Sequence, residues 1–112
     1  MDVQGQAMAQ LSLFMEEAIK LCNELYDYTC CNFSVFCGED AELITKIINE
    51  RKQIVDSLIK LEDEIDMLVE KAGSSVYEYA YQLPYGVDEF RMAVRSILGK
   101  VSDLDLKAMS LL

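Results

Sequence analysis

Four cysteines carry the most reactive side chains of this chain, and their spacing favours neither a metal site nor a disulfide. They are Cys22, Cys30, Cys31 and Cys37. Zinc sites are usually built from paired C-x-x-C units, which this spacing does not contain. Disulfides persist mainly in exported proteins, and residues 1–10 contain no Lys or Arg, so they lack the basic start of a secretory signal. We therefore expect reduced, half-buried thiols, with a redox or metal site as the alternative.

The second candidate for chemistry is the segment from Glu62 to Asp66, where only Ile65 is not acidic. It lacks the glycine and the loop pattern of an EF-hand calcium site, so we expect a solvated helix face. The chain has no histidine, which removes the commonest general base and metal ligand. No nucleophile–base pair and no Gly-rich phosphate loop is visible. The sequence predicts a protein that is not an enzyme and needs no cofactor, and an enzymatic alternative would require a metal at the acidic segment or at the cysteines.

The charge balance limits the partners that the protein can bind. Among 112 residues, 20 are acidic and 10 are basic, which gives a net charge of −10. Nucleic-acid binding needs a basic face, and an anionic membrane surface attracts basic segments. No apolar run reaches the ~18 residues of a membrane span. We therefore expect a single domain, residues 1–112, in the cytosol, which binds no nucleic acid and does not insert into a membrane.

The helices that would position these residues are marked by apolar periodicity, most clearly in the middle third. Alternating steps of three and four residues connect Ile44, Ile47, Arg51, Ile54, Leu58, Leu61, Ile65, Leu68 and Ala72. This spacing places one seam along a helix of residues 40–72, roughly 50 Å long at 1.5 Å per residue. Asp40 suits the cap at its start, and Gly73 suits its end. Such a helix must bury its seam against other helices.

Two further segments, residues 4–28 and 88–111, show the same rhythm. In the first, the seam is Met8, Leu11, Met15, Ala18, Cys22 and Leu25, and a second track of Phe14, Leu21 and Tyr28 widens it. A stripe this wide indicates contact with two neighbours. In the last, the seam is Val87, Phe90, Val94, Ile97, Val101, Leu104, Ala108 and Leu111. The predicted fold is all-α, an elongated antiparallel (up-down-up) bundle of three amphipathic helices, with the central one longest.

The connectors and Arg51 leave alternatives open. Residues 29–38 have low helix propensity, so we expect a turn there rather than a helix that runs through. The tyrosine cluster of the second connector, Tyr77, Tyr79, Tyr81 and Tyr85, either packs on its own bundle or forms an interface. Arg51 interrupts the long seam. It either lies at the bundle edge with its head in water, or is a partly buried cation that fixes the register of the helices or pairs with a carboxylate on a partner helix.

Two stretches resemble a known family. Residues 40–72 combine an acid-rich start with the stretch from Glu50 to Ile54, and they resemble the long central helix of flagellar type III export chaperones of the FlgN/FliT type. Residues 90–112 resemble the family's final helix. Its closing pattern of leucines and polar residues is approximated from Leu104 to Leu111, with Ala108 in place of the usual asparagine.

The resemblance implies a bundle that holds the terminal helix of an unassembled filament-type or hook-associated protein until export, in an apolar groove that the last helix can mask. Following this, we expect an amphipathic helix as the partner. The expected partner-binding residues are Ile47, Arg51, Ile54, Leu58, Leu61, Tyr77, Tyr79, Tyr81, Val94, Ile97, Val101 and Leu104. The alternative is a structural coiled-coil module that self-associates and has no export role. A homodimer stays open in either case.

Overall fold

The computed structural model describes residues 3–110, which are almost entirely helical and contain no strand. The long helices are α1 (Val3–Cys31), α3 (Ala41–Ala72) and α5 (Val87–Ser110). Short elements connect them, namely α2 (Phe33–Phe36), α4 (Ser75–Glu78) and the 3-10 turn η1 (Ala80–Gln82). The predicted all-α class is confirmed, and α3 is the longest helix, with 32 residues. The predicted end of the last helix, at Leu111, lies outside the described residues.

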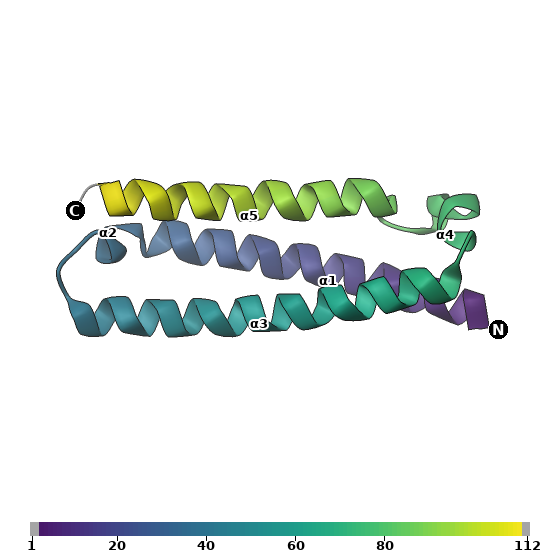
Figure 1. Cartoon of the computed structure of the whole chain (residues 1–112), viewed down its shortest axis with the longest axis horizontal. Helices are drawn as coiled ribbons and strands as arrows, with labels where there is room; N and C mark the ends of the chain where they lie inside the picture. Colours follow the sequence, from purple (N-terminus) through teal and green to yellow (C-terminus); the bar gives the residue numbers. More distant parts are fainter. Residues whose placement is uncertain (1–2, 111–112) are drawn as a thin grey trace.

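The long helices lie side by side in a body of 55 × 20 × 17 Å, with α2 at one end and α4 at the other (Figure 1). Helix α1 packs against both α3 and α5, whereas α3 and α5 approach each other at few positions. The helix in contact with both others is thus α1, as the wide apolar stripe of residues 4–28 predicted. Helix α3 is central only in the order of the chain.

The first connector differs from its prediction. Helix α1 continues to Cys31, and α2 forms a further helical turn, so most of residues 29–38 are helical. The hydroxyl of Thr29 donates to the carbonyl of Leu25 at 2.8 Å, and the side-chain amide of Asn32 donates to the carbonyl of Tyr28 at 2.8 Å. Both side chains donate to the carbonyl four residues earlier, a local bond that Thr and Asn form near helix ends. The expected turn is reduced to a break at Asn32 and to the segment between α2 and α3.

The ends of α3 agree with the sequence. The carboxylate of Asp40 accepts a hydrogen bond from the backbone N–H of Leu43 at 3.2 Å, which caps the first turn. Gly73 follows the last turn with φ 58°, a left-handed value that a residue with a Cβ rarely adopts.

The three seams form one core. All six residues of the α1 seam are buried, as are most of those on α3 and α5. Ile44, Arg51, Ile54, Ile97 and Leu104 are half-buried, because they lie toward the α2 end or at the edge of the seam. Val76 and Leu83 from the second connector close the core at the α4 end. None of the helices in residues 3–110 has the length and hydropathy that crossing a bilayer would require.

Candidate helix-binding cleft

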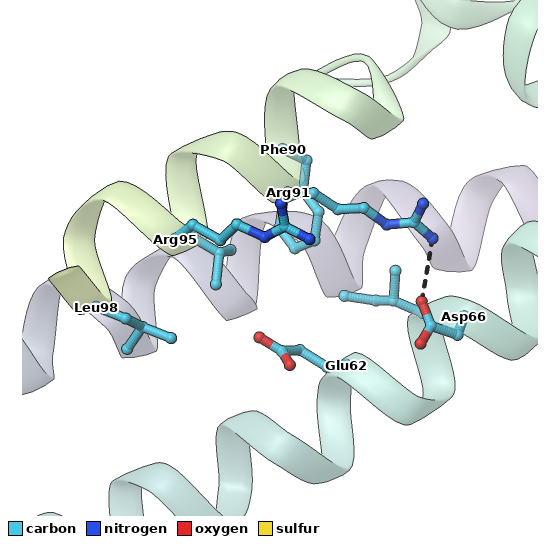
Figure 2. Close-up of a pocket in the computed structure, with 8 residues that line it drawn as sticks. Glu62, Asp66, Phe90, Arg91, Arg95 and Leu98 are labelled. Carbon is cyan, nitrogen blue, oxygen red and sulfur yellow. Dashed lines mark hydrogen bonds and ion pairs between the residues drawn. The ribbon is translucent and has the colours of Figure 1, made fainter.

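An open cleft of about 280 Å³ lies between α3 and α5 (Figure 2). It forms because α3 and α5 both pack on α1 but hardly on each other, so α1 passes behind the gap between them. Helix α3 contributes Glu62, Ile65 and Asp66 to its lining, and α5 contributes Phe90, Arg91, Val94, Arg95 and Leu98.

The bottom of the cleft is apolar. Ile65, Phe90 and Val94 belong to the buried seams, and Leu98 is half-buried beside them. Clefts that hold drug-sized molecules usually enclose ~300–1,000 Å³. The volume of this cleft lies just below that range, so it suits a few apolar side chains from a larger partner better than a whole small molecule.

The two walls carry opposite charges. Glu62 and Asp66 lie on α3, and Arg91 and Arg95 lie on α5 (Figure 2). A single ion pair of 3.2 Å joins Arg91 to Asp66, and both side chains are exposed. Within residues 3–110, no ion pair joins Glu62 to Arg95, although both face the cleft.

Burial raises the pKa of Glu62, and the neighbouring carboxylates of Asp66 and Asp63 add to the effect. Asp63 and Asp66 are exposed, as expected for a solvated acidic face. Glu62 instead points into the cleft (Figure 2). Both the burial and the neighbouring carboxylates oppose its ionisation.

Arg51 forms a two-pronged ion pair with Asp105 of α5. Its two terminal nitrogens donate to the two carboxylate oxygens at 2.9 and 2.6 Å, and the side chains are 15% and 31% exposed. The guanidinium also lies 5.9 Å from the ring centroid of Phe36 in α2. Of the two alternatives for Arg51, the structure has the partly buried, paired cation, and its partner belongs to the same chain. The pair ties α3 to α5 near α2.

The expected partner-binding residues occupy different surroundings. Five are buried in the core, namely Ile47, Leu58, Leu61, Val94 and Val101. Among all twelve, Val94 alone lines the cleft. Helix α1 packs along α3 and so covers much of the seam where the groove is expected. Side chains of α5 also reach this seam, since Arg51 pairs with Asp105 and Ile65 shares the cleft with Phe90.

The three tyrosines lie at the other end of the molecule from Arg51. Tyr77 and Tyr81 are 70% and 79% exposed, and Tyr79 meets Tyr81 edge to face at 6.3 Å between ring centroids. Arg51 contacts α2, while Tyr77 is part of α4, and these short helices mark opposite ends (Figure 1). The exposed rings of Tyr77 and Tyr81 thus pack little on the bundle. The structure does not bring the three tyrosines together with Arg51.

The cysteines differ in accessibility. Cys22 is buried, and burial together with the nearby charge of Glu62 raises its pKa to about 11. Cys30 and Cys31 are exposed, so the expected half-burial applies to Cys37 alone. None of the four is disulfide-bonded. No group of three potential metal ligands comes together in the described part of the chain.

Comparisons of the chain with models of protein families, with curated proteins and with solved structures find no match. The cleft is thus interpreted from its own residues.

Proposed function

We propose that this protein is a small, non-enzymatic chaperone or adaptor whose α3–α5 cleft binds an amphipathic helix of another protein. The observation that carries the proposal is the open cleft itself, with its apolar bottom and charged rims. Amphipathic helices bind in apolar grooves through residues at i, i+3, i+4 and i+7. The α5 residues that line the cleft span Phe90 to Leu98, a length of roughly 12–14 Å at 1.5 Å per residue. A partner helix of two to three turns matches that length.

We further infer that the three long helices form an up-down-up bundle and that the protein acts in the cytoplasm as an export chaperone of the flagellar type. Its client would be an unassembled filament-type or hook-associated protein. The resemblance of residues 40–72 and 90–112 to the FlgN/FliT-type helices supports the export role. The placement of the connectors α2 and α4 at opposite ends supports the up-down-up arrangement (Figure 1). The acidic balance of the chain agrees with a protein partner rather than a nucleic acid.

The test is binding of labelled peptides, measured by fluorescence anisotropy. The peptides would carry the terminal helices of the hook-associated and filament proteins encoded in the same genome. Leu98→Glu places a charge at the bottom of the cleft and should weaken binding at least tenfold, because the charge must be desolvated. Met92→Glu is the matched control on the same helix, since Met92 is 70% exposed and lies outside the cleft. Absence of binding by every peptide, or equal loss in both variants, would contradict the proposal.

Self-association is the second candidate, and exposed apolar residues on α3 favour it. Ile48, Ile59 and Met67 are 48%, 52% and 59% exposed. Exposed apolar residues on one helix can form the contact between two copies. Light scattering after gel filtration distinguishes the two functions. A monomer agrees with the adaptor, whereas a dimer that Ile59→Lys dissociates would favour the structural module.

A further inference from the structure

We propose that the cleft selects a helix with one basic and one acidic flank, oriented with the basic flank toward α3 and the acidic flank toward α5. This inference rests on the proposed function and adds the chemistry of the partner. The cleft carries opposite charges on its two walls, Glu62 and Asp66 on one and Arg91 and Arg95 on the other (Figure 2).

The spacing of these charges matches that of a bound helix. Both pairs are four residues apart, so each wall presents two like charges about one helical turn apart. A partner helix that buries its apolar stripe against the bottom of the cleft places the residues beside that stripe against the two walls. Flank residues of the partner that are three or four positions apart repeat at the same interval. Each wall can thus pair with two successive charged residues of the partner.

The charges of the walls are available for a partner. Glu62 and Arg95 are joined to no ion-pair partner within residues 3–110, and the single pair between Arg91 and Asp66 is exposed at both ends. Exposed pairs of this kind contribute little stability. A bound helix can therefore exchange the Arg91–Asp66 contact for its own without a large loss.

The basic wall is what discriminates between partners. A protein of net charge −10 attracts any basic helix. Arg91 and Arg95 oppose a helix that is basic on both flanks, since one flank would then face like charges. A helix with one flank of each sign meets opposite charge on both walls in one direction only, because turning it end to end exchanges its flanks. The same charges therefore determine the direction of the bound helix.

The test uses two synthetic peptides of about 18 residues with the same leucine stripe. The mixed-flank peptide has Lys along one flank and Glu along the other, and the basic-flank peptide has Lys along both. Binding to the full-length protein is measured at about 0.15 M salt, where interactions beyond ~8 Å are screened. Three proteins are compared, namely the unchanged chain, Arg91→Glu/Arg95→Glu and the control Lys46→Glu/Lys107→Glu. The control makes the same change in net charge at exposed positions outside the cleft.

In Arg91→Glu/Arg95→Glu, the ratio of the two dissociation constants should shift toward the basic-flank peptide. The shift should exceed that of the control by about fourfold or more, because the mixed-flank peptide loses two exposed ion pairs and the basic-flank peptide gains two. Arg91→Gln/Arg95→Gln, which only removes the charges, should shift the ratio in the same direction by less. Melting followed by circular dichroism confirms that each variant is folded.

An equal shift in the cleft variant and the control would overturn the inference, because bulk charge would then explain it. So would an unchanged ratio while both peptides still bind, and in that case the proposed function would stand. If neither peptide binds the unchanged protein, nor do the peptides from the flagellar proteins, the proposed function itself fails. A dimer whose dissociation is required before either peptide binds would mean that a second copy occupies the cleft, and this too overturns the inference.

Discussion

The ion pair between Arg51 and Asp105 should stabilise the fold more than the exposed Arg91–Asp66 pair, because it is partly buried and two-pronged. Hydrogen bonds to charged groups contribute ~1.5–3 kcal/mol when buried, whereas exposed pairs contribute ~0.2–1 kcal/mol. Arg51 and Asp105 are 15% and 31% exposed and share two bonds, which places the pair between these limits. We expect a coupling energy of about 1–2 kcal/mol.

The measurement is a double-mutant cycle of Arg51→Met and Asp105→Asn, with the free energy of unfolding obtained from urea denaturation. Methionine keeps the packing of the arginine stem, and asparagine keeps the shape of the aspartate. The control cycle removes the Arg91–Asp66 pair, which is 46% and 65% exposed and should couple by less than about 0.5 kcal/mol. If the two cycles give equal coupling, then partial burial and two-pronged geometry add nothing, and the reasoning is wrong.

Three further predictions follow from the core, the thiols and the cleft. Leu58→Ala should lower the free energy of unfolding by about 2–5 kcal/mol, because Leu58 is 2% exposed. Its neighbour Ile59 is 52% exposed, so Ile59→Ala should change it by less than about 0.5 kcal/mol, and equal losses would refute the buried seam. Alkylation near pH 8, followed by intact mass, should label three cysteines in the folded protein and four after denaturation without reductant, because burial raises the pKa of Cys22 to about 11. Uptake of a fourth label at the rate of the others in the folded state would contradict this. Finally, Glu62→Gln should raise the melting temperature at neutral pH. The raised pKa of Glu62 means that ionisation destabilises the fold, and this cost disappears below its ordinary pKa of 4.5. A gain of the same size at low pH would show that charge is not the cause.

Helix bounds and buried faces could be predicted from the sequence because they follow from local rules. An apolar seam must leave water whichever helix covers it, so Leu11, Leu58 and Val94 are all buried as their spacing indicates. Asp40 and Gly73 act within one turn of α3, and their roles need no tertiary information. The extension of α1 to Cys31 was not predicted because Thr29 and its neighbours have low helix propensity. In the structure, the side chains of Thr29 and Asn32 donate to carbonyls four residues earlier.

The pairing of the helices could not be predicted, since three apolar seams are chemically interchangeable. Only the width of the α1 stripe distinguishes one of them, and it correctly indicates two neighbours. The expected partner groove along the α3 seam stays a prediction, and in the structure α1 packs along that seam. The ion-pair partner of Arg51 could not be predicted either, because the chain contains 20 acidic residues that could pair with it.

The cleft was missed because charged residues on a helix are normally read as its solvent face, and Arg91 and Arg95 fit that reading. One signal was present, the equal spacing of Glu62 with Asp66 and of Arg91 with Arg95, in opposite charge. This equal spacing indicates a cleft only if these two pairs of residues lie opposite each other. That arrangement follows from the separate packing of α3 and α5 on α1. Ile65, Phe90 and Val94 then serve both as core and as the bottom of the cleft. Burial alone therefore cannot distinguish a core residue from a binding residue at the place where two helices diverge over a third.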